Sequence, residues 1–279
     1  MSRTHKYLAV SYSSFAGFPA PLTNGGLNQH LVAGRDVSAG ARLELRQMTS
    51  NPQRGLNYSD LARIALERAR TAREAAQIVG SLVEEHGYAT FGGNSHIFAD
   101  TTEGWIVLEF AGGQGLWVAQ RLGADDIRVF RGGYIGEIPL DYRTHPDYMG
   151  SENLISFAVE QGWYDSQSGK PFNVHAVYGV DRQPNLAGSQ IRTEAMEYME
   201  AWLRQRSSRL TLQDMMEAVR SSVITRESAG YGQVAHLKRG VRSEVAPLWI
   251  ALAPSLASLS CLSTLGLLTC PRSTRNTAI

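Results

Sequence analysis

Alternating apolar and polar residues open the chain and predict strands. Residues 7–13 alternate over the length of one strand, and residues 31–37 form a second short candidate. Between them, Asn24-Gly25-Gly26 is typical of a tight turn. We therefore expect two strands near the start of the chain, separated by a turn at these residues.

The pattern then changes to a helical period. Ser59 precedes an apolar-periodic stretch that reaches residue 66, and its hydroxyl is expected to cap that helix. Thr71 and Glu74 have the spacing of a capping box at the start of a second helix. Gly87 is expected to end that helix. Its apolar residues recur on one face, namely Ala75, Ile78, Val79, Leu82 and Val83.

Further along, strands and helices occur in separate blocks. Residues 95–100, 104–110 and 116–122 are rich in β-forming residues and are separated by short polar or glycine-rich turns, which predicts consecutive hairpins. Helical patterns return at three places, residues 152–161, 192–206 and 212–219. Antiparallel strands in one block and helices in others predict a layered α+β fold.

Composition limits the class of protein. The 279 residues carry 27 Lys and Arg against 26 Asp and Glu, a net charge of +1, which does not favour nucleic acid as a partner. Hydrophobic residues at 43% and charged residues at 19% are typical of a globular protein. No linker divides the body, so we expect one domain over residues 1–254 and a poorly specified tail over 255–279.

An uncharged stretch over residues 245–270 has two interpretations. Its length could span a bilayer, but Pro247 and Pro254 interrupt it and Ser and Thr dilute it. A core strand followed by the tail is the favoured interpretation, and a membrane helix is the alternative. The N-terminus carries no apolar run of signal-peptide length, so a cytoplasmic location is expected. The sequence is also compatible with a homo-oligomer.

Few residues suggest metal or cofactor chemistry. The two cysteines, Cys261 and Cys270, can form neither a disulfide framework nor a CxxC metal site in the body of the chain. None of the seven histidines forms a helical i, i+4 pair, so neither metal nor cofactor is expected. A Ser, His and Asp triad that assembles only in the folded chain stays possible.

Several short motifs, taken in order, resemble the cysteine dipeptidase family, which includes dipeptidase A and the secernins. The resemblance runs from about Tyr7 to Trp249. The matching segments are GGLNQHLVA at 25–33, ARTAREA at 69–75, FADTTEGWIVLE at 98–109, GLWVAQRL at 115–122, IGEI at 135–138 and NLISFA at 153–158.

The resemblance implies an N-terminal-nucleophile hydrolase with a four-layer αββα sandwich. Such an enzyme cleaves amide bonds in small substrates, typically dipeptides. It uses the thiol of its first mature residue as the nucleophile and the α-amine of the same residue as the base, since an amine with a pKa near 8 can accept a proton at neutral pH. It needs no cofactor, and its partner is a small peptide substrate.

The chain departs from the family pattern at both ends. It has no N-terminal cysteine and lacks the family's "R-N-x-D" segment, so we expect a sandwich that is incomplete at the N-terminus. Ser2, exposed by removal of Met1, is a weaker alternative nucleophile. Residues 255–279 carry no family pattern, as a frameshift would produce. Two readings stay open: a dipeptidase-like hydrolase, or a catalytically silent homologue that binds a peptide or small ligand as a scaffold.

Three residues correspond to substrate-pocket positions of the family. Asn28 and Ser38 match a strand and a turn where relatives present an oxyanion or substrate contact. Arg192 matches an inward arginine near the start of a helix, where it could hold a substrate carboxylate. The structural alternatives are a turn amide bonded to its own backbone for Asn28 and a salt-bridged helix residue for Arg192.

Overall fold

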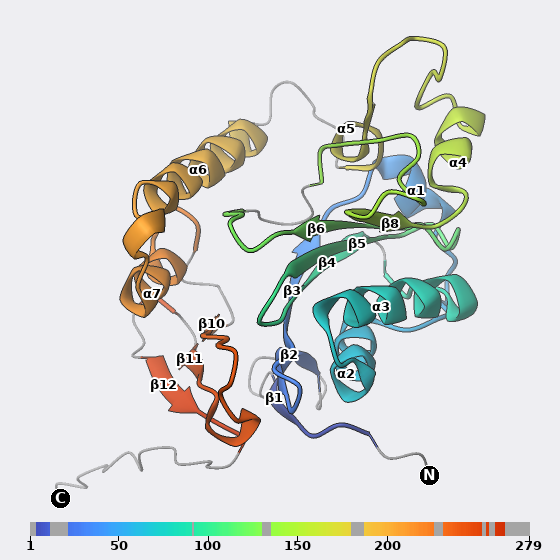
Figure 1. Ribbon diagram of the computed structural model, residues 1–279. Helices are drawn as coiled ribbons and strands as arrows, with labels where there is room; N and C mark the ends of the chain where they lie inside the picture. The colour runs from blue at the N-terminus through green and yellow to red at the C-terminus, as the bar shows by residue number, and fades with distance from the viewer. Residues whose placement is uncertain are drawn as a thin grey trace, which may run out of the picture.

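The structure is a computed structural model that describes residues 4–11, 22–90, 92–129, 135–179, 187–225, 231–252, 255–256 and 260–265, with the backbone alone for 187–193 and 252. It contains helices and antiparallel strands in separate layers, which confirms the α+β class. Figure 1 shows a large sheet at the centre, helices against it, and a smaller sheet nearer the C-terminus.

Seven strands form the large sheet in the order β1-β2-β3-β4-β5-β6-β8, and every neighbouring pair is antiparallel. The three expected hairpin strands are present. The strands are β1 (Tyr7–Ser11), β2 (Thr23–Asn28), β3 (Ala33–Ala39), β4 (Gly93–Ala99), β5 (Gly104–Phe110), β6 (Trp117–Leu122) and β8 (Tyr148–Gly150).

The prediction of a turn at Asn24-Gly25-Gly26 was wrong, because these residues lie inside β2. Gly25 and Gly26 have φ values of 142° and 152°. A Cβ atom on either glycine would approach the carbonyl oxygen of a neighbouring strand to 2.0 Å or less. Glycine is needed here for close approach between strands rather than for chain reversal. The chain reverses after β2, where Leu31 has a φ of 62°.

Two helices, α2 (Tyr58–Arg68) and α3 (Ala72–His86), cover one face of the large sheet. The cap of α2 is Asn57 rather than Ser59: the Asn57 side chain accepts hydrogen bonds from the backbone N–H groups of Ser59 and Asp60. Thr71 caps α3 as expected, accepting from the Glu74 N–H. The Glu74 carboxylate, however, accepts from the Arg70 N–H, so the capping box is not reciprocal.

The opposite face of β5 and β6 is covered by short elements from three parts of the chain. Three short helices each contribute a buried side chain, Leu45, Phe157 or Tyr178, to one cluster. This cluster also contains Ile106 of β5 and Val118 of β6. These elements are α1 (Leu43–Met48), α4 (Leu154–Glu160) and α5 (Val174–Tyr178), together with the two-stranded sheet of β7 (Glu137–Ile138) and β9 (Phe172–Asn173).

The C-terminal part adds a three-stranded antiparallel sheet of β10 (Tyr231–Ala235), β11 (Leu248–Leu252) and β12 (Ser260–Ser263). Tyr231 and Ile250 share a buried cluster with Val10, Leu27 and Ala33 of the large sheet. The helix α7 (Leu212–Arg220) packs on the other side of β10. It follows α6 (Ala187–Arg204) in the chain. Two 3₁₀ turns lie at Ser207–Arg209 and Ser243–Val245.

The uncharged stretch over residues 245–270 contains β11 and β12, and β12 lies within the expected tail. Among the described residues, no helix has the length and apolar character needed to cross a membrane.

Candidate functional site

Asn28 is fully buried at the end of β2, and its amide bonds to four backbone groups of the described residues. Its Nδ2 donates to the carbonyl oxygens of Leu66 and Ala69 at 3.0 and 2.8 Å. Its Oδ1 accepts from the N–H groups of His30 and Val32 at 2.9 and 3.0 Å. The side chain therefore joins the end of α2 to the turn between β2 and β3.

The other two predicted site residues lie apart from Asn28. Ser38 is exposed on β3 and is paired in register with Asn94 of β4. The backbone of Arg192 lies in α6, and its side chain is outside the described residues. The described residues therefore do not bring these three side chains together into one site.

A buried polar ladder, consisting of Asn24, Asp36, Asn94, His96 and Glu109, crosses β2 to β5 on the face beneath α2. His96 Nδ1 lies 2.8 Å from Glu109 Oε1, and its Nε2 lies 3.0 Å from the Tyr58 carbonyl oxygen. Because a carbonyl only accepts, Nε2 carries a proton. Asn24 Nδ2 donates to Asp36 Oδ1 at 2.5 Å, and Asp36 stands opposite His96 in register.

The pKa values of three members of the polar ladder are raised, for two different reasons. Desolvation raises the pKa of both Asp36 and Glu109. Desolvation by itself lowers the pKa of His96, but Glu109 and Asp36 outweigh it, so the net pKa of His96 is raised. One proton held between His96 Nδ1 and Glu109 Oε1 agrees with the raised pKa of both groups, because it keeps this buried pair close to neutral.

The polar ladder escaped sequence analysis because its members are far apart along the chain and each lies in a strand of ordinary length. A signal was nevertheless present: His96 and Glu109 occupy positions where a half-buried strand would place apolar residues. The chemistry available to the ladder is storage and transfer of a proton. The first turn of α2 covers His96 through the Tyr58 carbonyl.

A second polar group lies between the two larger sheets. The Arg35 guanidinium stacks over the Tyr231 ring at 3.6 Å, and its Nη2 donates to the Tyr231 carbonyl at 3.3 Å. Gln233 Nε2 donates to the Gly34 carbonyl at 3.1 Å. Arg35 Nη1 and Gln233 Oε1 are buried without a hydrogen-bond partner among the described residues. Such a donor and acceptor can bind water or a small polar ligand.

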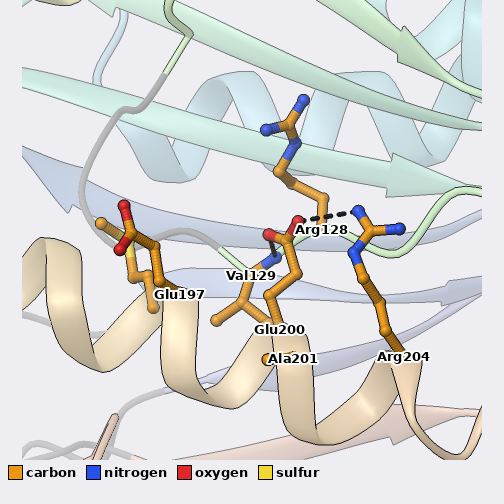
Figure 2. A pocket seen from close by; sticks show the side chains of 7 residues that line it. Arg128, Val129, Glu197, Glu200, Ala201 and Arg204 are labelled. Carbon is orange, nitrogen blue, oxygen red and sulfur yellow. Dashed lines mark hydrogen bonds and ion pairs between the residues drawn. The ribbon is translucent and has the colours of Figure 1, made fainter.

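Figure 2 shows a surface pocket of about 300 Å³ beside α6. Glu200 accepts a hydrogen bond from the Val129 N–H at 3.0 Å and forms an ion pair with Arg204 at 2.8 Å. The exposed Arg128 extends away from this pair. An adjoining pocket of about 440 Å³ also includes Arg128 and Arg204, together with His145. These pockets offer charged groups of both signs to a small polar ligand.

Within the part of the chain that the structure describes, no three His, Cys, Asp or Glu side chains form a cluster suited to a metal ion.

Comparison with known proteins identifies the family. The profile of Peptidase family C69 matches residues 23–208, about two thirds of the chain. The chain belongs to Peptidase family C69. The C69 match includes the polar ladder, all strands of the large sheet except β1, and the whole of α6, which confirms the resemblance inferred from the short motifs.

Individual C69 relatives carry dipeptidase names. The chain is 32% identical over 145 residues to a "Probable dipeptidase" from Salmonella dublin. This match covers 52% of this chain and 32% of that protein. It is 25% identical over 174 residues to a "Probable dipeptidase A" from Streptococcus pyogenes serotype M1. This second match covers 58% of this chain and 36% of that protein. The matched segments thus span about a third of the length of these relatives. C69 is, by its description, a family of peptidases.

Proposed function

We propose that this chain is a dipeptidase-like hydrolase that cleaves amide bonds in small peptides. The observation that carries the proposal is the C69 match over residues 23–208, together with relatives named as dipeptidases. The proposed location is cytoplasmic.

The fold we propose for this activity is the four-layer αββα sandwich of the N-terminal-nucleophile hydrolases. Three sets of contacts support the order of the layers. The helices α2 and α3 pack on the large sheet, the cluster around Tyr231 and Ile250 joins that sheet to β10 and β11, and α7 packs on β10. In such a sandwich the polar group with Arg35 and Gln233 lies between the two sheets.

The proposed nucleophile is a cysteine thiol at the N-terminus of the mature protein, with its own α-amine as the base. The two cysteines of the sequence do not supply it. Cys261 lies on β12, an edge strand of the smaller sheet, and Cys270 lies outside the described residues. Asn28, Ser38 and Arg192 remain proposed substrate or oxyanion contacts.

The test begins with the N-terminal residue of the protein isolated from its native source, obtained from its intact mass and N-terminal sequence. Hydrolysis of a panel of dipeptides is then measured with and without iodoacetamide. A double variant, Cys261→Ala with Cys270→Ala, shows whether the alkylator acts through these two thiols. Turnover that the variant retains and iodoacetamide abolishes, in a protein that starts with cysteine, would support the proposal.

Absence of turnover from a protein that starts at Met1 or Ser2 would overturn it. If dipeptides then raised the melting temperature of that protein without being cleaved, the chain would act as a binding or scaffold protein.

A further inference from the structure

Two histidines far apart in the sequence meet beside the first hairpin. His5 precedes β1, and His30 lies in the turn between β2 and β3. The Nδ1 atom of His5 and the Nε2 atom of His30 are 3.3 Å apart. The Nε2 atom of Gln29 completes a triangle, 3.4 Å from the first nitrogen and 3.5 Å from the second.

This spacing is the one that a tetrahedral metal ion imposes on its ligands. Zinc-to-imidazole bonds of about 2.0–2.1 Å at the tetrahedral angle place two ligand nitrogens about 3.3–3.4 Å apart. Imidazole is a ligand that Zn²⁺, Ni²⁺ and Cu²⁺ all accept. Without a metal, the same two nitrogens share one N–H···N hydrogen bond, which requires one ring to be a donor and the other an acceptor.

The backbone around the pair holds both histidines in place. The His5 N–H donates to the Glu67 carbonyl at 2.7 Å, and the His30 N–H donates to Asn28 Oδ1 at 2.9 Å. Lys6 and Gln29 exchange two further bonds: the Gln29 N–H donates to the Lys6 carbonyl, and the Lys6 N–H donates to Gln29 Oε1. Only side-chain torsions therefore have to change for the rings to open around an ion.

The required opening is small. The ring centroids are 4.2 Å apart and the rings are nearly perpendicular, at 77°. A metal lying in both ring planes would hold the centroids about 5 Å apart. Both histidine side chains are partly exposed, so each ring has room on its solvent side to rotate. Of the charged groups near His30, Arg70 opposes a cation and Glu74 favours one.

We propose that His5 Nδ1 and His30 Nε2 bind one divalent transition-metal ion of the zinc, nickel or copper type. Water fills the remaining coordination positions, and the Gln29 amide faces one of those waters. The ion would join the segment before β1 to the β2–β3 turn. The proposal does not depend on the proposed hydrolase activity, although the His30 N–H bonds to Asn28, one of the proposed substrate contacts.

The test is calorimetric titration of the full chain with ZnCl₂ and with NiCl₂. We expect binding of one ion per chain, weakened at least about tenfold by His5→Ala and by His30→Ala separately. His86→Ala is the matched control, because His86 is a half-exposed histidine at the end of α3, and it should leave binding unchanged.

Thermal unfolding gives a second readout. Zinc should raise the melting temperature of the wild-type chain and of His86→Ala, and EDTA should reverse this increase. Zinc should not change the melting temperature of His30→Ala. Circular dichroism shows whether each variant is folded, and His30→Gln replaces His30→Ala if the latter does not fold. Undetectable binding by the wild-type chain would overturn the proposal. Unchanged binding by the double variant His5→Ala with His30→Ala would do the same.

Discussion

Asn28 uses both donors and both acceptor positions of its amide on the backbone of α2 and of the β2–β3 turn. Asn28→Ala leaves four backbone groups without this partner in a fully buried place. We expect the free energy of unfolding to fall by about 3 kcal/mol, measured by urea denaturation.

The control for this prediction is Gln77→Ala, which removes an exposed amide from the surface of α3 and should change stability by less than about 0.5 kcal/mol. A comparable loss in both variants would contradict the role given to Asn28. The substrate-contact role proposed for Asn28 makes a different prediction, since it would lower turnover without lowering stability.

His96 makes stability depend on pH. Because its pKa is raised in the folded state, its contribution is complete below its ordinary value of 6.5 and is lost as pH rises through the higher folded-state value. The raised pKa values of Asp36 and Glu109 act in the same direction. We expect the free energy of unfolding to fall as the pH rises above 6.5 and through the raised pKa of His96.

Urea denaturation at several pH values in this range checks the prediction. His96→Gln should flatten the pH dependence of the free energy of unfolding, and the control His86→Gln should leave it unchanged. Glu109→Gln serves the same purpose if His96→Gln does not fold. Equal slopes in the wild type, in His96→Gln and in Glu109→Gln would exclude the polar ladder as the source of the pH dependence.

At the scale of elements, α3 lies close to the large sheet because Gly80 faces Trp117. A Cβ atom at position 80 would come within 2.2 Å of the indole ring. Gly80→Ala gains up to about 1 kcal/mol in helix propensity, but overpacking costs about 1–3 kcal/mol. We expect a net loss of about 1–2 kcal/mol in the free energy of unfolding.

Ser81→Ala, on the exposed side of the same helix, isolates the propensity effect and should be neutral or slightly stabilising. The double variant Gly80→Ala with Trp117→Leu should recover part of the loss, because the smaller side chain leaves room for the new methyl group. A stabilising Gly80→Ala would show that the helix can shift away from the sheet at little cost.

Elements with a strong local signal could be predicted from the sequence, and those that depend on tertiary contacts could not. The period of α3 and its cap at Thr71 are local, and both are present. The strand β2 was missed because Gly25 and Gly26 resemble a turn, whereas here they allow neighbouring strands to approach. The pairing of His96 with Glu109 depends on the register of β4 and β5, which one sequence does not reveal.

At the scale of the whole molecule, Arg35 and Tyr231 join the two larger sheets across 196 positions of sequence. Arg35→Ala removes the cation–π contact and the hydrogen bond to the Tyr231 carbonyl together. We expect faster amide hydrogen exchange in β10 and β11 and unchanged exchange in β4 and β5.

Exchange measured by mass spectrometry with peptide resolution distinguishes these outcomes. Arg63→Ala is the matched control, since Arg63 is a half-exposed arginine on α2 whose ion pairs among the described residues are with Asp60 and Glu67 of its own helix. Faster exchange across the large sheet in Arg35→Ala would show that the two sheets unfold as one unit.

The order of strands in the large sheet also bears on the order of events during synthesis. From β1 to β6, each strand pairs with the next strand in the chain, so each pair can form as soon as its second strand leaves the ribosome. The smaller sheet arrives about a hundred residues later. Until then, the apolar residues of β1 to β3 that Tyr231 and Ile250 cover in the finished protein are open to other nascent chains and to chaperones.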